Sequence, residues 1–293
     1  MSLVSTIRFI SNHPLNRNNK LDAFFRFLKW QINVRVNPYP IIYPFTDKSK
    51  LIIKKSMTGA TGNLYCGLHE FYDMFFLLHF LRKDDLFIDI GANIGSYTIL
   101  ASAHVEADTI SIEPVPSTFS NLINNISINQ IQNKVTALNI ALGSQKSSLA
   151  FTNTLDTINH VATDSEKDTI VVNVETLDDI LINRKIPTLL KIDVEGFETE
   201  VIKGGKTTIN ENELKAIIIE LNGSGDRYGY SEIEIHEVLI HAGFNPYFYD
   251  PFARIIKMSE GFGTHNTIYI RDIEFVNERL INADKVKILT RTI

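Results

Sequence analysis

Hydrophobic residues from about position 68 onward fall into two alternating patterns. Short, nearly continuous apolar runs have the length of β-strands, and the stretches between them repeat apolar residues every three or four positions, as in a helix that packs on a core. The pattern predicts strands at residues 87–90, 109–112, 135–142, 188–194, 216–221, 244–249 and 267–270. It predicts helices at residues 68–82, 95–103, 117–129, 177–182, 198–209 and 232–242. This alternation indicates an α/β fold built on a mostly parallel, doubly wound sheet.

The predicted strand at 188–194 has the composition of a central strand. Leu189, Leu190, Ile192 and Val194 leave few polar positions, which is typical of a strand covered on both faces. Open sheets of this kind bind ligands beyond the carboxyl ends of their strands, at the point where strand order reverses. We therefore expect the functional residues at the carboxyl ends of the predicted strands.

The segment before residue 56 is predicted to be an N-terminal appendage. Six apolar residues in it recur mostly at helical spacing: Leu21, Phe24, Phe25, Phe27, Leu28 and Ile32. Such an amphipathic helix can dock on a membrane surface, but we expect it to pack on the protein's own core, because its polar face carries few cations. A short strand is predicted at 51–54. The predicted organisation is an appendage at residues 1–55 and a main domain at 56–293, with an inserted β-hairpin at about 143–174.

Composition and charge narrow the function classes. With 44% hydrophobic and 22% charged residues, the chain has ordinary globular composition. Its net charge is −5 without a block of basic residues, so we expect no nucleic-acid partner and instead a small-molecule or glycan partner. The single cysteine, Cys66, cannot form an intramolecular disulfide, which favours a reducing compartment, with the cytoplasm as the default. No run approaches the roughly 18 apolar residues of a transmembrane segment, and the sequence does not predict an oligomeric state.

A glycine-rich turn joins the first predicted core strand to the following helix. Asp89 ends the strand, and Gly91 and Gly95 flank the turn, so backbone N–H groups at the helix start face the expected cleft. This arrangement is typical of a cofactor-binding loop. The dinucleotide pattern Gly-x-Gly-x-x-Gly is replaced by Gly91-x-Asn93-x-Gly95, so the cradle for a diphosphate is missing.

Glu113 closes the second predicted core strand, 22 residues after Gly91. A carboxylate in this place can accept hydrogen bonds from both hydroxyls of a ribose. The turn and this acid together fit NAD or S-adenosylmethionine, and the missing diphosphate pattern favours S-adenosylmethionine. An NAD-dependent oxidoreductase is the alternative enzyme.

Four blocks of the sequence resemble the FkbM-type methyltransferases. They are Gly59 to Glu70 (GATGNLYCGLHE), Asp89 to Ile99 (DIGANIGSYTI), Ile112 to Pro116 (IEPVP) and Leu190 to Gly205 (LKIDVEGFETEVIKGG). The resemblance spans roughly residues 55–222, with a weaker echo at 266–270. The second block is common to many methyltransferases, whereas the fourth, at this distance from the second, is specific. The chain therefore resembles a class I methyltransferase with a Rossmann-like fold.

The resemblance implies methyl transfer from S-adenosylmethionine, commonly to a hydroxyl oxygen of a sugar or another small metabolite. It places five residues of the turn around the methionine part of the cofactor: Asp89, Gly91, Ala92, Asn93 and Gly95. It places Glu113 at the ribose, and it places three residues at the end of the third strand near the adenine: Asn139, Ala141 and Leu142. For Ala141 and Leu142, ordinary strand packing is an equally good interpretation.

Asp193 and Glu195 are the candidate catalytic residues. They stand two positions apart, so in an extended segment both side chains project to the same side, at the carboxyl end of a strand beside the cleft. A sugar hydroxyl is a poor nucleophile until a base removes or polarises its proton, and a carboxylate can act as that base. With an ordinary pKa of about 4 it is a weak base at neutral pH, unless burial raises the pKa, a metal such as Mg²⁺ assists, or positioning carries the catalysis.

Neighbouring residues of this block are given supporting roles. We interpret Glu198 as favouring the positive end of its own helix, and Lys191 as the ion-pair partner of Asp193. The eight histidines are scattered without the spacing of a helical metal site, so no metal site is predicted. His265, in a glycine-rich loop before the last strand, is an alternative base, although a surface position is the simpler interpretation.

Two loops are expected near the acceptor. The segment Gly223 to Tyr230 suits a mobile loop in which Tyr228 and Tyr230 stack on a sugar, and Gly59 to Gly67 is expected to close the cleft from the N-terminal side. The sequence thus predicts an S-adenosylmethionine-dependent O-methyltransferase. A non-catalytic nucleotide-binding or scaffold protein of the same fold is the alternative from another class.

Overall fold

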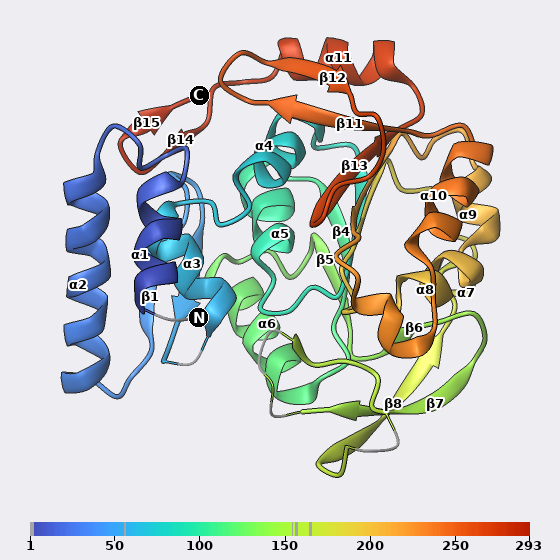
Figure 1. The fold of residues 1–293 in the computed structure, drawn as a ribbon, viewed down its shortest axis with the longest axis horizontal. Helices are drawn as coiled ribbons and strands as arrows, with labels where there is room; N and C mark the ends of the chain where they lie inside the picture. Colours follow the sequence, from blue (N-terminus) through green and yellow to red (C-terminus); the bar gives the residue numbers. More distant parts are fainter. Residues whose placement is uncertain (1–2, 56, 154, 156–157, 164–165) are drawn as a thin grey trace.

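An eight-stranded sheet forms the centre of the computed structural model, which describes residues 3–55, 57–153, 155, 158–163 and 166–293 (Figure 1). The strands lie in the order β12-β11-β13-β10-β9-β3-β4-β5. Their bounds are β3 Leu86–Ile90, β4 Asp108–Ile112, β5 Val135–Leu138, β9 Leu189–Ile192, β10 Ala216–Glu220, β11 Asn245–Asp250, β12 Ile255–Met258 and β13 Asn266–Ile270. The five strands from β10 to β5 run parallel, and β11, β12 and β13 add an antiparallel edge. The predicted α/β class and mostly parallel sheet are confirmed.

The order of the strands reverses between β3 and β9. From β3 the chain continues to β4 and β5 on one side, and it later returns to β9 and β10 on the other side. Ile90 pairs with Ile192 in the register of these two strands. The carboxyl ends of β3 and β9 therefore lie side by side at a topological switch point, where such sheets bind ligands.

Helices cover both faces of the sheet (Figure 1). One core contains side chains from α4 Phe71–Phe80, α5 Ser96–Ile99, the π-helical turn η1 Leu100–His104 and α6 Pro116–Ile128. The other contains side chains from α7 Leu177–Ile180, α8 Glu198–Gly204, α9 Lys206–Asn210 and α10 Glu232–His241. Successive residues of β3 enter opposite cores, since Phe87 packs in the first and Ile88 in the second. This explains why the central strands are apolar at nearly every position.

The N-terminal segment packs on the first of these cores. It consists of α1 Leu3–Asn12, α2 Lys20–Val36, the hairpin of β1 Ile41–Pro44 and β2 Lys50–Ile53, and α3 Thr58–Cys66. Phe27, Trp30 and Leu51 share an apolar cluster with Phe75 of α4. The domain boundary at residue 55 stays a prediction.

Helix α2 does not bury the apolar set that the sequence analysis assigned to the core. Ala23, Phe27 and Trp30 face inward, whereas Leu21 and Phe25 are exposed. The expected packing of this helix on the protein's own core is confirmed, but of the six apolar residues that predicted it only Phe27 is buried. Helix α2 is apolar on two opposite sides, and its inward side is formed by Ala23, Phe27 and Trp30. The helix packs on the protein with only one of these sides.

The inserted segment forms a small sheet of its own. Its strands are β6 Ala141–Leu142, β7 Ser147–Thr152 and β8 Thr169–Glu175, and β7 and β8 pair as an antiparallel hairpin. The single strand predicted at 135–142 is wrong: β5 ends at Leu138, and β6 pairs with β8 instead. The chain turns there because the Asn139 amide donates to the carbonyl oxygens of Glu113 and Pro114. Residues 154, 156–157 and 164–165 of the predicted insertion lie outside the described residues.

The C-terminal part adds elements that the sequence analysis did not predict. They are the 3-10 turn η3 Ser224–Tyr228, strand β12, helix α11 Ile273–Ile281 and the short strands β14 Lys287–Ile288 and β15 Arg291–Thr292. Throughout the described residues, each helix is too short or too polar to traverse a bilayer.

Candidate active site

A cavity of about 480 Å³ opens at the carboxyl ends of β3, β4, β9 and β10, at the switch point. Its volume lies in the range of small-molecule sites. Six carboxylates and one lysine line it: Glu70, Asp89, Glu113, Asp193, Glu195, Glu220 and Lys191. The excess of acid distinguishes this surface from the apolar strands below it.

The turn after β3 depends on glycine. Gly91 and Gly95 have φ of +79° and +88°, a region that favours glycine. A Cβ on Gly91 would lie 1.8 Å from the carbonyl oxygen of Asp193, so the ends of β3 and β9 approach each other only because this side chain is absent. Asn93, with φ of 52°, is the next residue of the turn in the left-handed region, which Asn tolerates better than most residues.

Asp89 and Glu113 are buried, and hydrogen bonds from nearby residues hold both. Asp89 accepts from the Thr98 backbone N–H at 3.0 Å and from the Thr98 hydroxyl at 2.7 Å. Glu113 accepts from the backbone N–H groups of Asn93 at 3.0 Å and Val115 at 2.9 Å. Burial raises the pKa of Asp89 to about 6 and that of Glu113 to about 7, against the effect of these hydrogen bonds. Both residues line the cavity and also hold its loops.

The predicted adenine residues divide into two groups. Ala141 and Leu142 line the cavity, whereas Asn139 is not part of its lining and ties the loop after β4. Phe151 and Ile158 of the inserted segment also line the cavity. Sequence reasoning missed these two because nothing in their spacing indicates which side of the inserted sheet faces the cleft.

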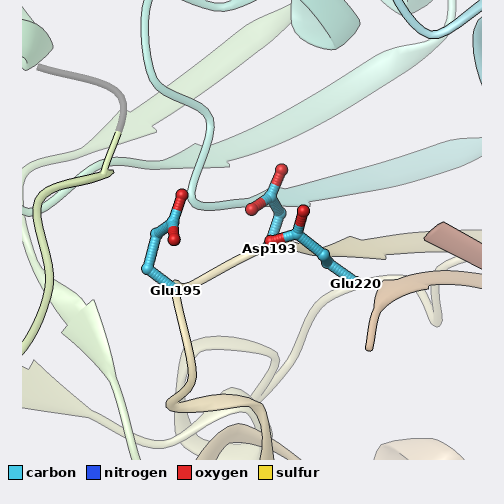
Figure 2. Close-up of side chains that lie close together, drawn as sticks. All are labelled: Asp193, Glu195 and Glu220. Atoms are coloured by element: carbon cyan, nitrogen blue, oxygen red, sulfur yellow. The ribbon is translucent and has the colours of Figure 1, made fainter. Parts of the chain in front are cut away.

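Asp193, Glu195 and Glu220 bring three carboxylates together (Figure 2). Asp193 and Glu195 follow β9, and Glu220 ends the neighbouring parallel strand β10. One oxygen of each lies within 4.8 Å of one oxygen of each other residue. The two predicted residues therefore lie in the cavity, and Glu220 joins them. Glu220 was missed because it comes from a different strand, and its only sequence signal was its position at a strand end.

Lys191 compensates part of this negative charge. Its Nζ lies 2.5 Å from Oδ2 of Asp193 and 4.7 Å from the centre of the Tyr97 ring, so the predicted ion pair is confirmed. Burial opposes the charge of Lys191, but Asp193, Glu70 and Asp89 raise its pKa above the ordinary value. Lys191 therefore carries a positive charge inside the cavity, next to the Asp193 carboxylate.

The pKa values of Glu195 and Glu220 are both raised above those of ordinary carboxyl groups. Burial, followed by the charges of Asp193 and Glu198, raises the pKa of Glu195 to about 7. Burial, followed by Asp193 and Glu195, raises the pKa of Glu220 to about 9. Oε2 of Glu220 is buried with no hydrogen-bond partner in the described part of the chain. The weakness of an ordinary carboxylate as a base is thereby removed at Glu195.

A side chain of α8 holds the backbone of the turn that follows β9. Glu195 has φ of 55°, which is unfavourable for a residue with a side chain. Glu198 is buried and accepts from the backbone N–H groups of Val194 at 3.0 Å and Gly196 at 3.3 Å. Glu198 is the first residue of α8, in agreement with its predicted position at the start of a helix. Its hydrogen bonds also hold the turn that carries Glu195.

The N-terminal wall comes from α3 and the residues after it. Gly59, Asn63, His69 and Glu70 line the cavity, so the predicted segment does border it, and most of it forms helix α3. The Glu70 carboxylate accepts from the Asn266 side chain at 2.6 Å. This contact links the sequence block that ends at Glu70 with the segment 266–270. The sequence analysis did not identify Glu70 as a site residue, because no spacing along the chain relates these two segments.

The loop after β10 does not present its tyrosines to the cavity. The rings of Tyr228 and Tyr230 lie 5.6 and 6.2 Å from that of Phe197, and the Tyr228 hydroxyl donates to the carbonyl oxygen of Val161 at 2.6 Å. Neither tyrosine lines the cavity, so the expected stacking on a sugar is wrong in this conformation. Phe197 lines the cavity in their place, and His265 lies at its edge.

The three carboxylates also form a group that can hold a metal ion. Oxygen ligands of this kind suit Mg²⁺. Sequence reasoning predicted no metal site because it considered histidines and did not combine β9 with β10. The same three groups can instead share a proton, which the raised pKa of Glu220 favours.

Comparison with known proteins gives one family. The sequence model of the Methyltransferase FkbM domain matches residues 89–246, more than half of the chain. Hexuronic acid methyltransferase AglP of Haloferax volcanii is 26% identical over 152 residues, which are 51% of this chain and 61% of that protein. Methyltransferase 1 of Beauveria bassiana is 31% identical over 146 residues, 41% of this chain and 58% of that protein. The chain thus spans less than two thirds of the length of either relative.

One solved structure is also similar to this chain. Methyltransferase FkbM from Methylobacillus flagellatus KT is 16% identical, with a TM-score of 0.46, and the alignment covers 73% of this chain and 55% of that one.

Proposed function

The chain belongs to the FkbM family of methyltransferases, and we propose that it transfers the methyl group of S-adenosylmethionine to a hydroxyl oxygen of a sugar or another small metabolite. One observation carries the proposal. A carboxylate with a pKa raised to about 7, Glu195, lies in the same cavity as the glycine turn and Glu113. Family membership favours this function over an NAD-dependent oxidoreductase.

The cofactor half of the proposed site follows the strand ends from β3 to β6. The positive φ and missing side chain of Gly91 let the ends of β3 and β9 approach each other at the floor of the cavity. The cavity continues from there past Glu113 to Ala141 and Leu142, which gives a continuous surface for a methionine part, a ribose and an adenine. S-adenosylmethionine would supply an electrophilic methyl group on a sulfonium. Asn139 is proposed to act only by holding the loop after β4.

The acceptor half would use Glu195 as the base. Its carboxylate accepts the proton of the acceptor hydroxyl, and a pKa near 7 makes this transfer effective at neutral pH. Asp193 pairs with Lys191 and can accept a second hydrogen bond that orients the acceptor. Glu198 contributes by holding the turn that presents Glu195.

The charge of the cavity limits the acceptor. An anionic acceptor would meet six carboxylates and one lysine, so it would need a divalent cation held by Asp193, Glu195 and Glu220. A neutral hydroxyl compound needs no such ion. The relative AglP is a hexuronic acid methyltransferase, which supports a sugar as the acceptor class. A hexuronic acid is anionic at neutral pH, so the preference for a neutral acceptor comes from the charge of this cavity and not from that relative. We therefore propose a neutral sugar hydroxyl as the acceptor.

Binding of S-adenosylhomocysteine, measured by calorimetry, tests the cofactor half. We expect binding, and we expect Glu113→Gln to weaken it by about tenfold, because one charged hydrogen-bond acceptor is lost. Glu213→Gln, at an exposed position, is the matched control and should bind normally. Folded protein that fails to bind at millimolar ligand would overturn the proposal.

Methyl transfer to a panel of sugars, followed with radiolabelled S-adenosylmethionine, tests the acceptor half. Turnover of a neutral sugar supports the proposal. Cofactor binding without turnover on any acceptor would instead support a non-catalytic protein of the same fold.

A further inference from the structure

An apolar stripe runs along the outward side of α2 and is left uncovered by the fold. Its members follow one another at intervals of four, three, four and four residues: Leu21, Phe25, Leu28, Ile32 and Val36. This spacing places them on one side of the helix, opposite the buried Trp30. Leu21 is 76% exposed, Phe25 64% and Ile32 62%. Single exposed apolar residues are ordinary, but a continuous stripe of this length needs a partner.

Helix α1 also has exposed apolar residues. It lies beside α2 near the left edge of the molecule in Figure 1 and exposes Leu3, Val4 and Ile7. Beyond the end of α2, Tyr39 and Ile42 are exposed as well. Exposed apolar residues therefore occur on several elements of the N-terminal segment.

The charge of this segment is opposite to that of the rest of the chain. Residues 1–55 contain ten Lys or Arg, two Asp and no Glu, a net charge of +8, and the remaining residues carry the difference from −5, which is −13. Lys20, Lys29 and Arg35 are exposed on α2, and Arg8 and Arg17 are exposed on and after α1. The net charge of the whole chain conceals this asymmetry. The cations border the apolar stripe.

We propose that α1 and α2 form a docking surface for an anionic lipid membrane. A helix that combines an apolar side with bordering Lys and Arg lies in the interfacial plane of a bilayer, where apolar side chains enter the acyl boundary and cations meet the headgroups. A protein partner would need a groove into which the protruding helix fits, whereas such a helix can lie in the plane of a bilayer interface. The −13 charge of the remaining residues is repelled by the same headgroups, so it keeps the N-terminal segment toward the membrane.

Flotation of the full chain with lipid vesicles tests the docking surface. We expect binding to phosphatidylcholine vesicles that contain about 30% phosphatidylglycerol, and binding about tenfold weaker or more to phosphatidylcholine alone. Raising the salt concentration should weaken binding to the anionic vesicles, because the attraction of exposed cations is screened.

Two triple variants separate the apolar and charged contributions. Leu21→Ser, Phe25→Ser and Ile32→Ser together remove the stripe, and Lys20→Glu, Lys29→Glu and Arg35→Glu together reverse the bordering charge. Each set should reduce binding to anionic vesicles by about tenfold or more. Matched controls on other exposed surfaces should leave it unchanged: Ile182→Ser, Ile233→Ser and Ile281→Ser, and Lys167→Glu, Lys257→Glu and Lys285→Glu. Normal melting temperatures and S-adenosylhomocysteine binding by all four variants would show that the fold is intact.

Three outcomes would overturn the proposal. The first is a full chain that floats with neither vesicle, and the second is equal binding to both vesicles. The third is a second copy of the chain as the partner: sedimentation would then show a dimer that becomes monomeric in the serine variant, with no vesicle binding. Failure of S-adenosylhomocysteine binding would affect only the proposed enzymatic function, because vesicle binding is measured separately.

Discussion

The two halves of the cavity are built by different means. On the cofactor side, backbone conformation sets the shape: Gly91 allows β3 and β9 to approach, and Asp89 and Glu113 accept hydrogen bonds from residues of the surrounding loops. On the acceptor side, side chains set the chemistry, since Glu195 and Glu220 are half-buried near other carboxylates. We infer that changes on the first side disturb folding and binding together, whereas changes on the second side alter turnover alone.

The largest effect is expected from Gly91→Ala. The new Cβ would meet the Asp193 carbonyl oxygen, and the residue would also have to keep φ of +79°, so the free energy of unfolding should fall by about 3 kcal/mol or more. Denaturant unfolding measures this change. Gly243→Ala is the control, because its φ is +89° but its nearest neighbour would lie 3.9 Å away, and it should cost only about 1 kcal/mol. Equal costs for the two variants would contradict the role of the close approach.

Next in size is Glu195→Gln, which should lower kcat by about 100-fold or more through loss of the base. The affinity for S-adenosylhomocysteine should change by less than about twofold, because Glu195 lies on the acceptor side. Glu213→Gln serves again as the exposed control. A variant that keeps near-normal turnover would remove Glu195 from the role of base and direct attention to Glu220.

Stability and activity should depend on pH in opposite directions. Asp89, Glu113 and Glu195 have pKa values of about 6, 7 and 7, above their ordinary values near 4, so the folded state binds more protons than the unfolded state between these values. Their contribution to stability is full below about pH 4 and is lost as the pH rises through about 7, so the melting temperature should fall across this window. Turnover should rise as Glu195 loses its proton near pH 7, and Glu195→Gln should remove that rise. A melting temperature that climbs from pH 5 to 8 would contradict the burial of these acids.

The smallest effect is expected from removal of divalent cations. Lys191 already pairs with Asp193, and a neutral acceptor needs no further positive charge, so EDTA should change turnover by less than about twofold. Initial rates with EDTA and with added Mg²⁺ measure this. A large loss restored by Mg²⁺ would show that Asp193, Glu195 and Glu220 hold a metal ion during the reaction.

The cofactor side could be predicted from sequence better than the acceptor side, for a physical reason. The turn from Asp89 to Gly95 and the acid Glu113 are local features, since each is read from the residues that end one strand. Glu220 and Glu70 reach the cavity only through pairing of distant elements, β10 with β9 and Asn266 with Glu70, and no spacing along the chain encodes these contacts.

The sheet and the N-terminal helix show the same distinction. Strands such as β9 are apolar at most positions, so their burial follows from composition. Helix α2 is apolar on two sides, and its sequence does not say which side meets the protein. The break between β5 and β6 depends on the hydrogen bonds of one side chain, Asn139, which a hydrophobic pattern cannot register.

The fluorescence of Trp30 can report on the position of α2. It is the only tryptophan of the chain and lies buried on the inward side of α2, in contact with the first core. Its fluorescence therefore reports whether α2 is packed on the core. On heating, we expect the emission to change when that helix is released, before the central sheet unfolds. Membrane docking through the outward stripe should leave the emission unchanged, which separates docking from detachment in one measurement.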